Sequence, residues 1–75
     1  MSRYLTSNEF TGTKQLPINR NRDYLAIFAT AGSLTIKINK GTGVVPVVEG
    51  GFYEPYVAPT SSVEIIGGTF TVVEG

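Results

Sequence analysis

The sequence predicts a small all-β protein, and three observations support this prediction. First, apolar and polar residues alternate in short stretches, most clearly in residues 33–39, where Leu34, Ile36 and Ile38 share one face. Second, glycine, asparagine or proline interrupts these stretches about every 8–12 residues. Third, no longer stretch keeps the period of about 3.6 residues that marks a helix. The expected fold is an antiparallel β-sandwich or small barrel, jelly-roll-like, with about six or seven short strands.

Two of the expected strands carry a proline, which places them at an edge of the sheet. Residues 13–18 include Pro17, and residues 44–49 include Pro46. Because proline has no amide hydrogen to donate to a neighbouring strand, both segments are expected at edges or bulges. The proline-rich and aromatic residues 52–59 are expected to run extended over the surface instead of inside the sheet.

Glycine-containing turns are expected to join the other strands into hairpins. Such turns suit glycine because it adopts a positive φ angle without steric cost. The expected hairpins are residues 23–30 with 33–39 around Ala31-Gly32, and residues 62–68 with 69–75 around Gly67-Gly68. The polar residues 19–23 are expected to form a further turn, because asparagine and aspartate favour tight turns.

The strand over residues 23–30 carries apolar side chains on both faces. These side chains are Leu25 and Ile27 on one face, and Tyr24, Ala26 and Phe28 on the other. We therefore expect both faces of this strand to be covered by other parts of the protein.

The length of the chain allows one domain. Residues 1–12 are polar with scattered Tyr4, Leu5 and Phe10, and they show neither a helical period nor strand alternation. We expect an extended N-terminal arm here, or a short strand after an arm, followed by a single β-sandwich domain over residues 13–75. The apolar side chains of the arm are expected either to contact a partner or to fold back onto the domain's own core.

The small size of the chain leaves little margin of stability. For 75 residues, the hydrophobic gain and the conformational entropy cost of folding nearly cancel. Small domains usually gain stability from disulfides, a bound metal or oligomerisation. The chain has neither cysteine nor histidine, which excludes disulfides and argues against structural zinc. A homo-oligomer is therefore expected, with no metal and no cofactor.

Composition and charge argue against several classes of function. The net charge is zero and 16% of the residues are charged, so the basic surplus of a nucleic-acid-binding or membrane-surface protein is missing. The six acidic residues stand singly at turns or on polar strand faces, where paired carboxylates for acid–base catalysis do not form. We therefore expect a protein that is not an enzyme and binds neither nucleic acid nor membrane.

Residues 52–56, Phe-Tyr-Glu-Pro-Tyr, are the strongest candidate for a recognition surface. Aromatic side chains offer a large contact area at little entropic cost, and tyrosine is enriched at protein interfaces. Three interpretations stay open: an interface with another protein, a cap over one end of the sandwich, or a sugar platform in which two tyrosines stack on pyranose rings. The residues expected to make these contacts are Phe52, Tyr53 and Tyr56.

The densest charged cluster is Asn-Arg-Asn-Arg-Asp at residues 19–23. Arg20 and Arg22 are expected either to contact a carboxylate of a partner subunit through charge-assisted hydrogen bonds or to stand in a solvated turn beside Asp23. With Tyr4, Leu5 and Phe10 of the arm, these two arginines complete the set of expected partner-binding residues.

The layout of these elements resembles that of small accessory proteins of tailed-phage virions. The motifs that carry the resemblance are Arg22 to Ile27 after a basic turn, Gly-Gly-Phe-Tyr-Glu-Pro-Tyr-Val-Ala-Pro at residues 50–59, and Val-Val-Glu-Gly at residues 72–75. The resemblance covers roughly residues 18–75 and is to capsid decoration (cement) proteins and related head-fibre or tail-accessory modules.

This resemblance implies a β-sandwich that assembles as a homo-oligomer, often a trimer, on the outside of an icosahedral shell. The N-terminal arm would reach over the major capsid protein, and the protein would be made in the host cytoplasm and end up on the virion. The alternative function is that of a carbohydrate-binding or host-attachment module, built around the tyrosines of residues 52–56.

Overall fold

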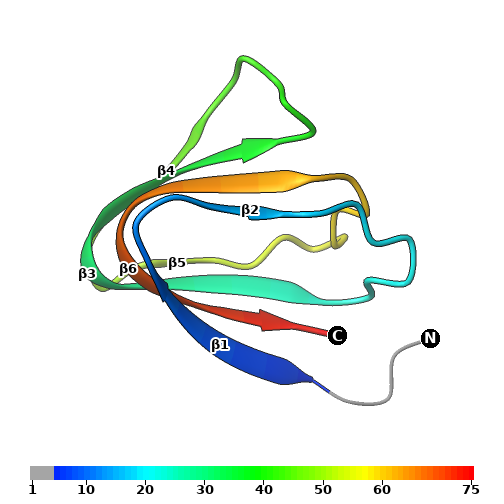
Figure 1. Cartoon of the computed structure of the whole chain (residues 1–75), viewed down its shortest axis with the longest axis horizontal. Helices are drawn as coiled ribbons and strands as arrows, with labels where there is room; N and C mark the ends of the chain where they lie inside the picture. Colours follow the sequence, from blue (N-terminus) through cyan, green and yellow to red (C-terminus); the bar gives the residue numbers. More distant parts are fainter. Residues whose placement is uncertain (1–4) are drawn as a thin grey trace.

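The sheet of this protein contains every strand that the structure describes (Figure 1). A computed structural model describes residues 5–75, and within them it shows one antiparallel sheet of six strands and no helix. The strands are β1 (Thr6–Thr11), β2 (Lys14–Leu16), β3 (Leu25–Ile38), β4 (Val45–Val47), β5 (Phe52–Tyr53) and β6 (Val63–Glu74). The prediction of a small all-β fold is confirmed. In this part of the chain, no helix has the length and apolar character needed to cross a membrane.

Two long strands, β3 and β6, bend near their middle and hold the sheet together (Figure 1). The second half of β6 pairs with β1 and with the first half of β3, which also pairs with β5. The first half of β6 pairs with β2 and with the second half of β3, which also pairs with β4. The sheet therefore folds onto itself into two layers of strands, in the orders β1-β6-β3-β5 and β2-β6-β3-β4.

The prediction of two glycine hairpins is wrong, because both glycine turns are bends inside continuous strands. β3 runs through Gly32, and β6 runs through Gly67 and Gly68. The two bends cross at close range: a Cβ atom on Gly68 would lie 1.8 Å from the carbonyl oxygen of Ala31, and one on Gly67 would lie 2.4 Å from that of Ser33. The register of β3 against β6 shifts on both sides of Ala31, as expected for β-bulges that bend a sheet.

The hydrophobic core lies between the two layers. On β3, the inward side chains include Leu25 and Ile27 before the bend and Leu34 and Ile36 after it, so the bulges change which residues face inward. The core cluster consists of Leu16, Leu25, Ile27, Ala29, Leu34, Ile36, Val47, Val63, Ile65, Phe70 and Val72. The predicted alternation therefore holds within each half of the strand.

The edges of the sheet agree with the positions of the prolines. β2 pairs only with β6 and ends just before Pro17, and β4 pairs only with β3 and contains Pro46. Both segments are edge strands, as predicted from the missing amide hydrogen. The expectation that residues 52–59 run outside the sheet is wrong for Phe52 and Tyr53, which form β5 and pair with β3. It holds for the rest of the segment, because residues 54–62 show no regular strand structure.

The second half of the expected arm is part of the sheet. Residues 6–11 form β1, which pairs along its whole length with the second half of β6, from Thr6 opposite Glu74 to Thr11 opposite Thr69. A short strand after an arm was one of the two expectations for residues 1–12, although alternation gave no signal for it because these residues are mostly polar and exposed.

The crossing of the two bends gives a stability prediction. Gly68→Ala forces a methyl group into the Ala31 carbonyl, and we expect it to lower the free energy of unfolding by about 3 kcal/mol or more, the upper range for overpacked sites. Gly43→Ala is the matched control, because nothing lies within 4 Å of its Cβ position, and its effect should stay within about 1 kcal/mol. Urea unfolding of both variants checks this, and equal stabilities would contradict it.

Candidate interaction surface

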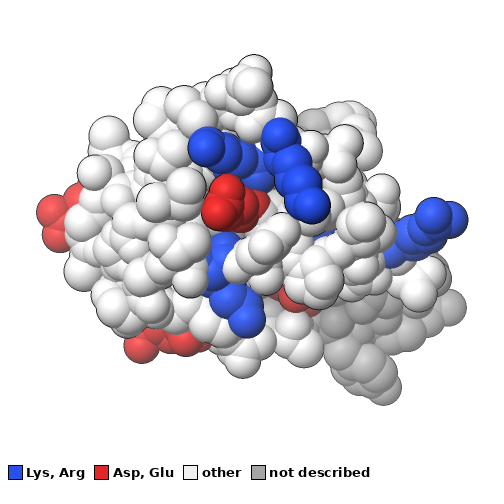
Figure 2. Space-filling view, turned by 45° about the horizontal axis from the view of Figure 1, so that its top comes forward, with Lys and Arg blue, Asp and Glu red and all other residues white. Residues whose placement is uncertain are grey.

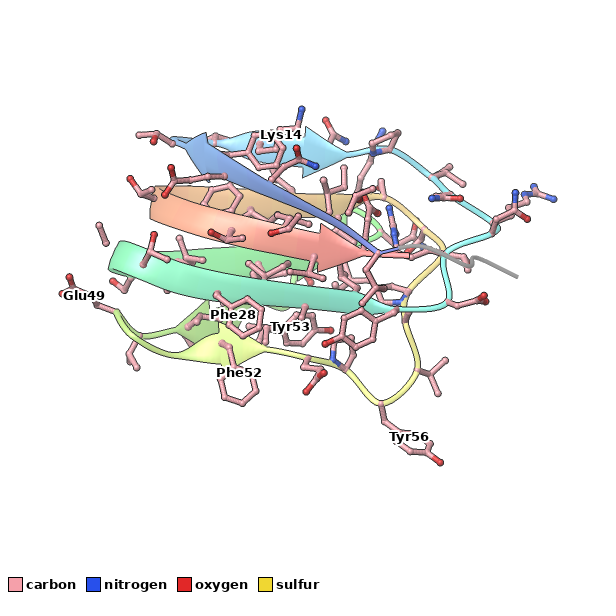
Figure 3. All side chains as sticks on the ribbon, turned by 90° about the horizontal axis from the view of Figure 1, so that it is seen from below. Lys14, Phe28, Glu49, Phe52, Tyr53 and Tyr56 are labelled. Atoms are coloured by element: carbon pink, nitrogen blue, oxygen red, sulfur yellow. The ribbon has the colours of Figure 1, made fainter. Side chains whose placement is uncertain are left out.

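Two phenylalanines form an exposed aromatic pair on the outside of the β1-β6-β3-β5 layer (Figure 3). Phe28 on β3 lies opposite Phe52 on β5 in the strand register, and their ring centroids are 5.8 Å apart. Because Ile27 and Ala29 point into the core, Phe28 between them points outward. Phe28 is 38% exposed and Phe52 is 61% exposed, so the expectation that both faces of this strand are covered is wrong at Phe28.

Exposed and half-buried residues alternate from Phe52 onward, and the exposed ones extend this surface. Phe52, Glu54 and Tyr56 are exposed, whereas Tyr53 and Pro55 are half-buried. Tyr56 is fully exposed, and Figure 3 shows it pointing away from the sheet at the end of this segment. We call Phe28, Phe52 and Tyr56 the aromatic strip.

A shallow depression of about 340 Å³ lies at one end of the aromatic strip. Its walls are Tyr24, Glu54, Pro55 and Tyr56. The hydroxyl of Tyr24 donates a hydrogen bond to Oε2 of Glu54 across it. This hydrogen bond is the main cause that raises the pKa of Tyr24 above its ordinary value of 10.0, and desolvation and the negative charge of Glu54 act in the same direction. The depression therefore combines two tyrosine rings with a carboxylate.

The sugar platform expected from Tyr53 and Tyr56 does not form. The ring of Tyr53 packs against the hydrophobic core, and its burial raises the pKa of its hydroxyl. Tyr56 points to solvent, so the two rings share no surface. The second tyrosine beside Tyr56 in the depression is Tyr24 and not Tyr53. The sequence contained a signal for it, because Tyr24 and Phe28 are four residues apart and fall on the same face of an extended strand.

Arg22 lies inside the protein, and neither expectation for it describes its place. The residue is 4% exposed, and its Nε donates to Oε2 of Glu74 over 2.9 Å. One terminal nitrogen donates to the carbonyl oxygens of Pro59 at 2.6 Å and Ser61 at 3.1 Å, and the other donates to that of Pro17 at 3.1 Å. The guanidinium group therefore has its hydrogen-bond partners within its own chain instead of in a partner subunit or in solvent.

The contacts of Arg22 join three segments at the end of the fold opposite the bends. These segments are the loop between β2 and β3, the loop between β5 and β6, and the end of β6. Backbone bonds tie the same segments, because the carbonyl oxygen of Gly75 accepts from the amides of Asp23 and Tyr24, and that of Thr60 accepts from the amide of Asn19. Arg22 is therefore a structural centre of this end.

Arg20 is exposed at the tip of the turn that residues 19–23 were expected to form. The turn is confirmed: the amide of Arg22 donates to the carbonyl oxygen of Asn19, and the amide of Asn21 donates to the side-chain oxygen of Asn19. Arg20 therefore remains available to a partner.

The three arm residues have different places. Phe10 folds back: its ring lies 5.9 Å from that of the buried Phe70, and the Nζ atom of Lys14 lies 4.8 Å from its centroid. Leu5 is exposed and available for a contact. Tyr4 lies outside the described residues.

Charged side chains are few on the surface. Figure 2 shows several Lys and Arg side chains around one acidic side chain, and most of the rest of that face is uncharged. Between residues 5 and 75, no three acidic side chains gather where they would hold a metal ion.

No protein-family model matches the chain, and no curated protein matches it.

The buried guanidinium group gives a second prediction. Arg22→Met removes the positive charge while Glu74 and three carbonyl oxygens stay in place, and we expect a loss of about 3–5 kcal/mol in the free energy of unfolding. Arg20→Met is the control, because this residue is exposed, and its effect should stay within about 0.5 kcal/mol. Thermal and urea unfolding measure both. A stable Arg22→Met variant would contradict the structural role.

The pair of Tyr24 and Glu54 gives a pH prediction. Because the pKa of Tyr24 in the folded protein lies above the ordinary 10.0, its hydrogen bond contributes stability at lower pH and is lost as the pH rises through the raised pKa. We expect Glu54→Gln to bring the pKa of Tyr24 back toward the ordinary value and Glu49→Gln to leave it unchanged. NMR titration of the Tyr24 ring carbons measures this, and an unchanged pKa in Glu54→Gln would contradict it.

Proposed function

We propose that this protein is a structural module that binds and stabilises a larger protein lattice, in the manner of a tailed-phage capsid decoration protein. In this proposal it acts on the outside of the virion as a homo-oligomer, and the aromatic strip contacts the major capsid protein or another virion protein. The similarity of its layout to such accessory proteins supports the choice of lattice.

The observation that carries this proposal is the exposed pair of Phe28 and Phe52. Each ring stands on a hydrogen-bonded strand, so little conformational freedom is lost when a partner covers it. Aromatic side chains at the centre of an interface contribute most of its binding energy, and aromatic pairs add to this beyond the area they bury.

The mechanism of stabilisation would be mass action. A module that binds the assembled lattice and not the free subunits stabilises the lattice by about 2.7 kcal/mol per site when its concentration is a hundredfold above the Kd. Contacts with several capsid subunits at once increase the effect through avidity.

Thermal melting of capsid shells that lack the protein tests the proposal. We expect added protein to raise the melting temperature, and we expect the double variant Phe52→Ser and Tyr56→Ser to bind the shells at least about tenfold more weakly. Val44→Ser is the control, because Val44 is a half-exposed apolar residue away from the strip, in the loop between β3 and β4. Shells that melt at the same temperature with and without the protein would overturn the proposal.

A second candidate function rests on the depression between Tyr24, Glu54, Pro55 and Tyr56. A carboxylate that accepts hydrogen bonds from sugar hydroxyls, next to an exposed ring that stacks on a pyranose, is a common way to bind carbohydrate. A glycan array separates the two candidates. Glycan binding that Glu54→Gln and Tyr56→Ser abolish would favour this function, whereas an array without signal would exclude it for the sugars present.

A further inference from the structure

The folded sheet has four edge strands, and they differ in how they discourage further pairing. Natural proteins protect edges with short strands, prolines or lysines. β2 has three residues with Lys14 among them and Pro17 just after them; β4 has three residues with Pro46 at their centre; and β5 has two residues. β1 has six residues, Thr-Ser-Asn-Glu-Phe-Thr, with neither proline nor lysine. Of the four edges in the described part of the chain, β1 is therefore the longest and the least protected, with Glu9 as its one charged residue.

The hydrogen-bonding groups on the open side of β1 follow from one observed bond. The amide of Gly12 donates to the carbonyl oxygen of Gly68, which lies opposite it when the register of β1 and β6 is continued by one residue. In an antiparallel pair, residues alternate between bonding the partner and facing away from it. Even-numbered residues of β1 therefore bond to β6, and the amide and carbonyl groups of Ser7, Glu9 and Thr11 point away from β6.

We propose that β1 pairs with β1 of a second copy of this chain, antiparallel and about a two-fold axis. The outward groups of Ser7 and Glu9 on each copy would exchange hydrogen bonds, and the β1-β6-β3-β5 layers of the two copies would join into one continuous sheet. Because the chain has zero net charge, two copies approach each other without long-range repulsion.

Symmetry and charge together select the register of this pairing. A two-fold axis perpendicular to the sheet passes through the centre of a residue pair, so one residue of β1 must lie opposite itself. An axis at Asn8 or Glu9 lets five residues of β1 pair with the second copy, whereas an axis at any other residue of β1 lets fewer pair. Of these two, an axis at Glu9 would place two carboxylates opposite each other, which is unfavourable. An axis at Asn8 places Asn8 opposite Asn8, Ser7 opposite Glu9, and Thr6 opposite Phe10. In this register each carboxylate faces a hydroxyl, so we assign the axis to Asn8.

The choice of a second copy, and not a foreign strand, rests on this self-complementarity. The only charge on β1 is Glu9, and in the Asn8 register it faces Ser7, whose hydroxyl can donate to it. The two Asn8 side chains can likewise bond to each other, because each amide both donates and accepts. This contact builds dimers or other even-numbered assemblies, which differs from the isolated trimer implied by the resemblance.

Engineered cysteines test the register, since the chain has no cysteine of its own. Opposed residues that do not bond each other have Cα atoms about 4.5 Å apart, within the range that a disulfide spans. We expect Asn8→Cys to form a covalent dimer rapidly in dilute solution with diamide as the oxidant. In the control Glu9→Cys, the two cysteines lie more than about 7 Å apart and should cross-link at least about tenfold more slowly. Equal rates, or faster cross-linking of Glu9→Cys, would overturn the register.

A proline substitution tests the pairing itself. Ser7→Pro removes the outward amide hydrogen and leaves the bonds between β1 and β6 in place, whereas Ser7→Ala keeps that hydrogen. We expect Ser7→Pro to raise the dimer dissociation constant at least about tenfold in sedimentation velocity, and Ser7→Ala to leave it within about twofold. Circular dichroism confirms that both variants are folded. A folded Ser7→Pro variant that dimerises like the unchanged protein would overturn the proposal, and so would an unchanged protein that is monomeric at micromolar concentration.

The test is independent of the proposed docking function. The double variant Phe52→Ser and Tyr56→Ser changes residues of β5 and of the segment after it, and β5 lies at the edge of the layer opposite β1. This variant should therefore dimerise normally while it loses binding to the shells. Loss of dimerisation in this variant would contradict the assignment of the dimer contact to β1.

Discussion

The close crossing of β3 and β6 at their bends decides how the sheet of this protein folds. At this point the two backbones approach so closely that a single methyl group on Gly68 would collide with the carbonyl of Ala31. Without the bends, the two long strands would form one open sheet with an exposed apolar face. With the bends, the two halves of the sheet pack face to face, and side chains from both halves form one core. The bulges at the crossing also decide which residues face outward, Phe28 among them.

The opposite end of the fold depends on a different interaction. The far end of the two layers is crossed by the loop between β2 and β3 and by the loop between β5 and β6. Arg22 joins these loops by donating to one carbonyl oxygen of its own loop and to two carbonyl oxygens and one carboxylate from segments distant in the sequence. A buried guanidinium group is tolerated here because every one of its nitrogens has a partner, and because Glu74 balances its charge. The position of the loop that carries Glu54 and Tyr56 depends on this network.

The sequence predicted the local features of this fold and not the ones that need distant contacts. Alternation predicted Leu34 in the core, and the missing amide hydrogen of Pro46 predicted its strand at an edge, as the structure has them. The pair Gly67-Gly68 suits both a hairpin and a sharp bend, and only the strand that crosses it decides between them. Arg22 looked like a surface residue because its carbonyl partners come together only in the folded chain. In the predicted recognition segment, residues 52–56, the sequence did not tell the half-buried side chains from the exposed ones.

The two proposed contacts use opposite edges of the same layer, and this arrangement has a consequence for binding. In the order β1-β6-β3-β5, the strand that pairs with a second copy lies at one margin and the aromatic pair of Phe28 and Phe52 lies at the other. Pairing through β1 therefore covers neither aromatic strip, and it fixes two of them at the outer margins of one continuous sheet. Binding of the first strip to a lattice raises the effective concentration of the second at a neighbouring site. Because a folded sheet is rigid, this gain requires that the spacing of lattice sites match the width of the dimer. A symmetric dimer would therefore bind lattice subunits in an ordered, repeating surface more tightly than it would bind the same lattice subunits free in solution.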